Sequence, residues 1–284
     1  MMKYSTDEGL IKLFVSIIPF NLNWSEEAPY FGYNLLYPAW TITYEIAFYI
    51  MFGLSISISH RYRTIIASVF IISIVSLVQY YSRGELSMSG SVSAGLLEHS
   101  TLFGYINVFT SPMMFEFVVG MIIGELYIKS RQIETISQHI KKISIICLLF
   151  ALSMCFVMFF SKVPYGHGLF GFGVLSFVVI TSLLFYERTN DIHKNKALSF
   201  LGDISYSLYM CHAIILAAYL YLYTRIDFLQ YINGMSLVVM LCSVSMVTAF
   251  LMHVYIELPC INYGKRILVR YAAGKETNSE EVSI

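Results

Sequence analysis

Four ionisable side chains lie within apolar stretches of the sequence, where a charged group costs at least about 2.5 kcal/mol to insert into lipid. They are Glu45, Glu116, His212 and His253. Such residues are candidates for chemistry, because a carboxylate or an imidazole can accept and return a proton during group transfer. Four more ionisable residues lie nearer the ends of these stretches, where charged groups can reach the lipid headgroups. These are Lys12, Glu125, Asp203 and Glu257.

Glu45 belongs to the segment YPAWTITYEIAFY and lies five residues, or about 7 Å, inside a predicted span. Thr41 precedes it by four residues and Tyr49 follows it by four, so the three side chains predict a polar stripe on one helix face. A carboxyl group on that stripe can exchange protons with a substrate. It can equally hold two helices together by a hydrogen bond, and the residues alone leave both roles open.

The segment LGDISYSLYMCHAII places Ser205, Tyr209 and His212 on one helix face at spacing i, i+4 and i+7. Gly202 and Asp203 just before it predict the entry turn of this helix, which puts His212 about 12 Å from the helix start. A histidine in a helix is often only a packing residue. A face of three polar groups at mid-membrane depth needs partners, however, and favours a polar cavity.

Two further patterns favour structure over chemistry. Glu116 precedes Gly120 and Gly124 by four and eight residues, and this spacing predicts a close contact with another helix. His253 and Glu257 are four residues apart and predict an intrahelical pair near a helix end at Pro259.

The composition indicates that these residues are carried by membrane-spanning helices. The chain has 284 residues, of which 57% are hydrophobic and only 13% are charged, with a mean hydropathy of +0.67. Soluble domains carry about 25% charged residues. The formal net charge of zero gives no attraction to nucleic acid. The five cysteines form no CxxC pattern, so neither a disulfide framework nor a metal site is expected.

Eight apolar stretches approach the length of about 20 residues that a bilayer requires. They are residues 9–20, 40–58, 64–81, 109–128, 143–160, 169–186, 204–223 and 235–257. The connections alternate between few and many Lys and Arg residues, which predicts that both termini are cytoplasmic. We therefore expect an all-α fold, a polytopic transmembrane helical bundle of about eight spans, as a single domain over residues 1–284.

Three separated segments together resemble the acyltransferase 3 family of membrane O-acyltransferases. AWTITYEIAFY (39–49) is similar to the family element W-[ST]-[LI]-x-x-E-x-x-F-Y, and FEFVVGMIIG (115–124) to its F-x-x-G-x-x-x-G helix. LSFLGDISYSLYMCHAII (198–215) is similar to the element F-L-G-x-x-S-Y-x-x-Y-x-x-H, and Ile256, Glu257 and Pro259 match a final I-E-x-P. The order and spacing of these segments carry the resemblance over nearly the whole chain.

The resemblance implies transfer of an acyl group, in most members acetyl, from acyl-CoA to a hydroxyl of a cell-surface polysaccharide or lipopolysaccharide sugar in the bacterial inner membrane. Acyl-CoA is then a co-substrate, no cofactor is bound, and the partners are membrane lipid and the glycan acceptor. The implied catalytic residues are Glu45 and His212. The implied substrate-binding residues are Trp40, Tyr49, Ser205, Tyr206 and Tyr209. The implied contacts to the acyl-CoA phosphates are Lys141, Lys142, Arg188, Lys194 and Lys196.

One family element has no counterpart in this sequence. Members begin with a helix in which an Arg is followed eleven residues later by a His, the favoured base for the acceptor hydroxyl, and no Arg here has a His at that offset. We therefore expect an N-terminally truncated member, either inactive as it stands or completed by a partner chain that supplies the first helices. A transporter or flippase-like protein, whose intramembrane Glu and His residues relay protons, is the alternative from another class.

Overall fold

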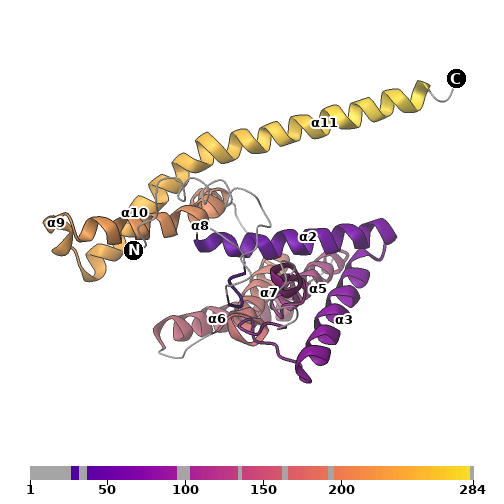
Figure 1. Cartoon of the computed structure of the whole chain (residues 1–284), viewed down its shortest axis with the longest axis horizontal. Coiled ribbons are helices and arrows are strands. Elements are labelled where there is room, and N and C mark those ends of the chain that lie inside the picture. Colours follow the sequence, from indigo (N-terminus) through magenta and orange to yellow (C-terminus); the bar gives the residue numbers. More distant parts are fainter. Residues whose placement is uncertain are drawn as a thin grey trace. The chain divides into compact units, whose positions relative to one another are not determined.

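Every regular element in the described part of the structure, a computed structural model, is a helix (Figure 1). The structure describes residues 27–31, 37–94, 103–133, 136–161, 166–190 and 195–281. In chain order the elements are η1 (Tyr37–Ala39), α2 (Trp40–Ile58), α3 (Arg63–Arg83), α4 (Phe103–Phe109), α5 (Met114–Ser130), α6 (Gln138–Phe160), η2 (Leu169–Gly173), α7 (Val174–Thr189), α8 (Lys196–Tyr223), α9 (Asp227–Gln230), α10 (Gly234–Met252), η3 (His253–Glu257) and α11 (Leu258–Glu281).

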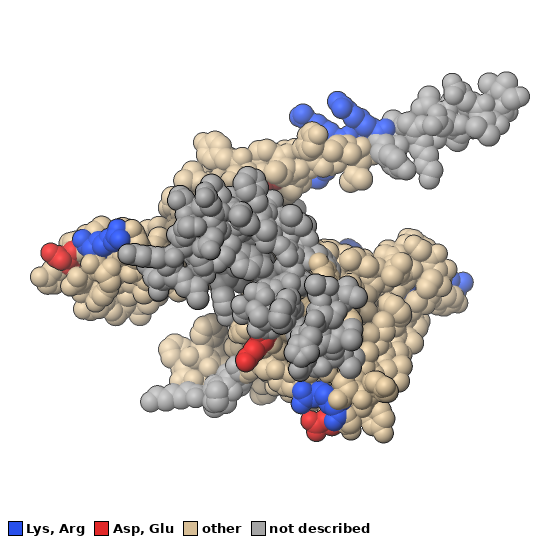
Figure 2. All heavy atoms as spheres, viewed as in Figure 1, with Lys and Arg blue, Asp and Glu red and all other residues tan. Residues whose placement is uncertain are grey.

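Seven of the described helical stretches are long and apolar enough to cross a membrane, which confirms the all-α polytopic fold. They are Trp40–Ile58, Arg63–Arg83, Gly104–Ser130, Gln138–Phe160, Leu169–Thr189, Lys196–Tyr223 and Gly234–Arg270. Each contains one of the predicted stretches from 40–58 onward, while the predicted stretch 9–20 lies outside the described residues. Charged side chains are sparse on the face seen in Figure 2, as lipid-facing helices require.

The chain divides into two compact units. The first unit comprises Met1–Leu35 and Ala39–His193, and the second comprises Leu36–Pro38 and Lys194–Ile284. In the first unit α2, α3 and α5 pack on one another, and α6 packs along α7. Its core joins α2, α3 and the α4–α5 region through large buried side chains such as Met51, Ile71 and Met114.

The second unit is built on the pair α8 and α10, which lie side by side. Among its described residues the buried cluster is small and consists of Ile204, Cys211 and Ala249, with Leu208 and Met252 packed against it. From α10 the chain passes through η3 into α11, which runs as one long helix (Figure 1).

The prediction that Gly202 and Asp203 form the entry turn of α8 is wrong, because the helix begins earlier. The side chain of Asn195 accepts hydrogen bonds from the backbone N–H groups of Ala197 (2.9 Å) and Leu198 (3.3 Å), which caps the helix at Lys196. His212 therefore lies sixteen residues, or about 24 Å, from the helix start.

The prediction that Pro259 ends a helix is also wrong. Pro259 cannot donate a hydrogen bond, and its ring crowds the preceding turn of a regular α-helix. Here the turn before it is the π-helix η3, in which the N–H of Leu258 bonds the carbonyl of His253. The wider turn accommodates the proline, so the helix continues as α11.

The predicted close helix contact at Gly120 and Gly124 is absent from the described residues. A Cβ atom added at either glycine would meet no atom within 4 Å. Glu116, one turn before Gly120, therefore needs an explanation other than support of a tight helix crossing.

Candidate active site

A cavity of about 250 Å³ in the first unit contains two carboxyl groups. We call it the carboxylate cavity. Its lining residues come from α2, from α5 and from the turn before α5: Trp40, Thr41, Tyr44, Glu45, Met113, Glu116 and Phe117. Glu45 and Glu116, both expected to be isolated charges in lipid, thus face one shared space.

The first turns of α2 position one wall of this cavity. Two pairs of residues four apart, Trp40 with Tyr44 and Thr41 with Glu45, place these four side chains on neighbouring faces of α2. Trp40 is only 7% exposed, and its ring packs edge to face on Tyr44 with centroids 5.8 Å apart. The hydroxyl of the buried Tyr44 donates a hydrogen bond to the carbonyl of Pro29 (2.9 Å), which ties this wall to the segment before α2.

Glu116 forms the opposite wall near the start of α5. Its carboxylate interacts with the backbone of Gly168, in the turn that leads into η2 and α7. The same carboxylate also approaches Gly173, where an added Cβ atom would lie 3.4 Å from its oxygen. The side chain is thus contacted by the turn and η2 that precede α7, while it faces Glu45 from α5.

His167 lies beside the carboxylate cavity, although it belongs to the connection before α7. Its ring packs edge to face on Trp40 (centroids 5.3 Å apart) and on Tyr30 (5.8 Å). Its Nε2 atom shares a hydrogen bond with the hydroxyl of Tyr30 (3.1 Å). Tyr30 in turn packs on Trp40 at 5.2 Å, so the three rings form one cluster against the cavity wall.

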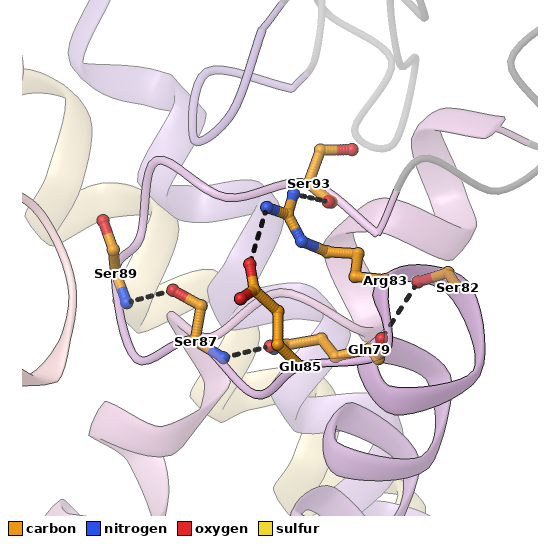
Figure 3. A network of polar contacts seen from close by, with 7 residues as sticks. All are labelled: Gln79, Ser82, Arg83, Glu85, Ser87, Ser89 and Ser93. Carbon is orange, nitrogen blue, oxygen red and sulfur yellow. Dashed lines mark hydrogen bonds and ion pairs between the residues drawn. The ribbon is translucent and has the colours of Figure 1, made fainter.

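A polar network anchors the connection after α3 to the end of that helix (Figure 3). Gln79, which is 1% exposed, accepts a hydrogen bond from the backbone N–H of Ser87 (2.8 Å). Arg83 donates to the carbonyl of Ser93 (3.2 Å). The segment between these anchors reaches His167, whose carbonyl accepts a hydrogen bond from the N–H of Gly90 (2.8 Å).

Glycine is required where the connection after α3 meets the connection before η2. Gly168 has φ +105° and forms a β-bridge with Ser89. A Cβ atom at Gly168 would lie 2.3 Å from the nitrogen of Gly90 and 2.6 Å from the carbonyl oxygen of Met88, and neither backbone atom can move aside easily. The absence of a side chain therefore sets the position of His167 and of the amide that contacts Glu116.

The second unit contains the other predicted polar face. Ser205, Tyr209 and His212 line a groove of about 600 Å³ between α8 and α10, which we call the α8–α10 groove. The hydroxyl of Tyr209 donates to the carbonyl of Pro38 (3.0 Å) in the same unit. Ser205 donates to the carbonyl of Gly202 (2.8 Å), and the Nδ1 atom of His212 lies 3.3 Å from the carbonyl of Leu208, so both bond to their own helix.

The remaining predicted substrate-binding residues do not line these spaces. Tyr49 is 61% exposed on α2 and lies outside the carboxylate cavity, although Thr41 of the same predicted stripe lines it. Tyr206 is 51% exposed on α8 and lies outside the α8–α10 groove.

The basic residues predicted to meet phosphates have different surroundings. Arg188 donates hydrogen bonds to the carbonyls of Ser130 and Ile133, which satisfies the end of α5. It also borders an apolar cavity of about 270 Å³ between α5, α6 and α7. Lys141 is half-buried on α6, Lys142 and Lys196 are exposed, and Lys194 lies outside the described residues.

No set of three or more His, Cys, Asp and Glu side chains converges as metal ligands would within the described ranges. The carboxylate cavity contains the side chains of Glu45 and Glu116, whose own chemistry can be stated. A carboxylate can accept the proton of a hydroxyl, and backbone or side-chain donors can stabilise an oxyanion.

Sequence reasoning missed three residues of this region as site residues: Tyr44, Glu116 and His167. Glu116 carried a usable signal, because it is an acidic residue inside an apolar stretch. His167 lies in a connection, where a polar residue costs nothing. The flanking glycines in GHG were its only local signal.

Comparison with known proteins places the chain among acyltransferases. The sequence model described as an acyltransferase domain matches residues 9–254. The exopolysaccharide production protein ExoZ of Rhizobium meliloti (strain 1021) is 25% identical over 178 residues, which cover 63% of this chain and 48% of ExoZ. The match thus spans about half the length of that relative. No solved structure matches the chain.

Proposed function

The chain belongs to the acyltransferase 3 family, and we propose that it is a membrane O-acyltransferase that moves an acetyl group from acetyl-CoA to a hydroxyl of a cell-surface polysaccharide or lipopolysaccharide sugar. The family and the seven apolar helices identify a multi-pass membrane protein. The bacterial inner membrane is the location that this reaction requires, because the donor is cytoplasmic and the acceptor is exported.

The observation that carries the proposal is the pairing of Glu45 with Glu116 in one cavity lined by Trp40. Acyl transfer to a hydroxyl needs a group that takes the hydroxyl proton and a space from which water is excluded. The cavity supplies two carboxyl groups that lie among aromatic and aliphatic side chains. ExoZ acts in exopolysaccharide production by its name, which supports a glycan as acceptor.

The reaction balances without a further reagent. The acceptor oxygen bonds to the carbonyl carbon of the acetyl thioester, the carbon–sulfur bond breaks, and the hydroxyl proton ends on the thiol of CoA. In this scheme Glu45 and Glu116 assist the proton transfer, while the roles of His212, Ser205 and Tyr209 rest on the resemblance of their segment to the family.

The basic residues of the cytoplasmic connections would attract the phosphates of the donor. Arg188 already binds two carbonyl groups, so its charge contributes to the local field and its hydrogen-bonding capacity is partly used. Lys141, Lys142 and Lys196, together with Lys194, are the lysines that we assign to this attraction.

The test compares the surface glycan of cells that carry the gene with that of cells that lack it. We expect ester-linked acetyl groups, detected by mass and removed by mild base, only when the gene is expressed. Glu45→Gln should abolish them at unchanged protein level. Glu187→Gln, which changes an exposed acidic residue at the end of α7, is the matched control and should retain them.

The same experiment separates an enzyme from a transporter. A transporter would change the amount of glycan at the surface and leave its acetyl content per sugar unchanged. Equal acetyl content with and without the gene, under confirmed expression, would contradict the proposed function.

A further inference from the structure

His167 has the features of a reacting group and not only of a packing residue. Its ring is half-buried beside the carboxylate cavity and contacts Trp40, which lines that cavity. The backbone of Gly168, the next residue, interacts with the carboxylate of Glu116, which also approaches Gly173 in the following turn. His167 is therefore linked to the cavity in two ways: its ring contacts Trp40, and the next residue, Gly168, interacts with Glu116.

The structure holds the imidazole in a defined orientation from several directions. Tyr30 shares a hydrogen bond with Nε2, and Trp40 packs against the ring. The backbone is fixed by the hydrogen bond from Gly90 and by the bridge between Ser89 and Gly168. The network of Figure 3 anchors the connection after α3, which carries Ser89 and Gly90, to α3 itself. Restraining a side chain in this way costs conformational entropy. A fixed orientation is useful to a group that must present one atom to a substrate.

One ring nitrogen remains available. Nε2 is occupied by Tyr30, whereas Nδ1 makes no hydrogen bond within the part of the chain that the structure describes. When Nε2 carries the proton and donates to the phenol oxygen, Nδ1 presents a lone pair. An oriented imidazole with one free lone pair can accept a proton from a hydroxyl group.

We propose that His167 accepts the proton of the acceptor hydroxyl at the edge of the carboxylate cavity, with Tyr30 as the residue that orients its ring. This inference rests on the proposed function. The O–H bond of the sugar breaks and its proton moves to Nδ1, while the sugar oxygen bonds to the carbonyl carbon of the acyl thioester. The carbon–sulfur bond then breaks, and the imidazolium gives its proton to the leaving thiolate. Glu116, adjacent through Gly168, stabilises the transient positive charge on the ring.

The test measures transfer of labelled acetyl groups from acetyl-CoA to the cells' surface glycan in membranes that contain the full chain. His167→Ala should lower the rate by about 10²–10⁴-fold, as removal of a general base does. Added imidazole should restore part of this rate, because it can occupy the vacated space. His139→Ala, at the exposed start of α6, is the matched control and should keep the wild-type rate.

His167→Phe separates proton transfer from packing. Phenylalanine keeps an aromatic ring against Trp40 but cannot accept a proton, so this variant should be folded and as inactive as His167→Ala. Near-wild-type activity of His167→Phe, or a folded His167→Ala that imidazole fails to restore, would overturn the inference. Tyr30→Phe should cause a smaller loss in kcat at unchanged KM for the acceptor. If the wild-type membranes transfer no acetyl at all, the proposed function fails and not the assignment of His167.

Discussion

The carboxylate cavity and the α8–α10 groove hold their polar residues in different ways. In the carboxylate cavity, Glu45, Glu116 and the neighbouring His167 come from separate parts of the chain. They are contacted by α2, by α5, by the connection before η2 and by the connection after α3. In the groove, Ser205 and His212 lie on one helix and bond to that same helix. The first arrangement depends on tertiary packing, and the second on the periodicity of α8.

This difference predicts how each region responds to substitution. A change in the carboxylate cavity affects groups that orient one another, so effects on activity should be large and not additive. A change at an exposed polar residue of the groove removes a group without disturbing its neighbours. The predictions below test this contrast, beginning with the largest expected effect.

Glu116→Gln should lower acetyl transfer by about 10²–10⁴-fold, because the amide has the shape of the carboxylate but lacks the negative charge that assists the proton transfer. If Glu45 and Glu116 act as one unit, the double variant Glu45→Gln/Glu116→Gln should be no slower than the slower single variant. Initial rates with labelled acetyl-CoA measure both effects. Losses that multiply in the double variant would show that the two carboxylates act independently.

Gly168→Ala should lower both activity and stability, because the added methyl group meets the backbone of Gly90 and Met88 in a conformation with φ +105°. We expect a loss of about 2–4 kcal/mol in stability, from strain and from the displaced connection. Gly84→Ala is the matched control. Its φ is +73°, but no atom lies within 4 Å of the added Cβ, so it should cost only about 1–2 kcal/mol and keep activity.

Thermal unfolding of both glycine variants in detergent, followed by size-exclusion chromatography, gives the comparison. Equal destabilisation by the two substitutions would mean that the contact of Gly168 with Met88 and Gly90 adds nothing to the loss of stability beyond backbone strain. The carboxylate cavity would then be held less tightly than its contacts indicate.

Much of the fold follows from the sequence, because lipid allows the backbone few solutions. An apolar stretch of about 20 residues must satisfy its hydrogen bonds internally and is therefore helical. This argument predicted α2 with its bounds as observed. It failed at the ends of α8 and α10, where Asn195 caps a helix outside the apolar stretch and the π-turn η3 accommodates Pro259.

The candidate site was only partly predictable for a related reason. Thr41 and Glu45 are four residues apart on α2, and helical periodicity alone puts these two cavity-lining residues on one face. Glu116 meets them from about 70 residues away along the chain, and His167 from more than 120. Their approach depends on how Gly168 lets two connections touch, a tertiary contact that no local pattern encodes.

In the second unit, Ser207→Ala should destabilise the protein more than Ser205→Ala, two residues earlier on the same helix. The hydroxyl of the buried Ser207 donates to Glu257 at 2.7 Å, and Glu257 also pairs with His253 at 3.0 Å. Loss of a hydrogen bond to a charged group costs about 1.5–3 kcal/mol. Ser205 is exposed and bonds to its own helix, so its loss should cost less than about 0.5 kcal/mol. Thermal unfolding in detergent measures the difference, and equal costs would show that the α8–η3 contact is not stabilising.

His212→Ala should have the smallest effect on stability, below about 0.5 kcal/mol, because the ring is exposed in its unit and bonds only to the helix that carries it. If His212 lines the substrate path, acetyl transfer should nevertheless fall about tenfold, which corresponds to about 1.4 kcal/mol in the activation barrier. Unfolding temperature and transfer rate are measured on the same preparation, with His60→Ala as the exposed control. A large loss of stability would mean that His212 is a packing residue, and the α8–α10 groove would then resemble the carboxylate cavity in depending on tertiary contacts. Unchanged stability together with an unchanged rate would remove His212 from the site and leave the chemistry to the first unit.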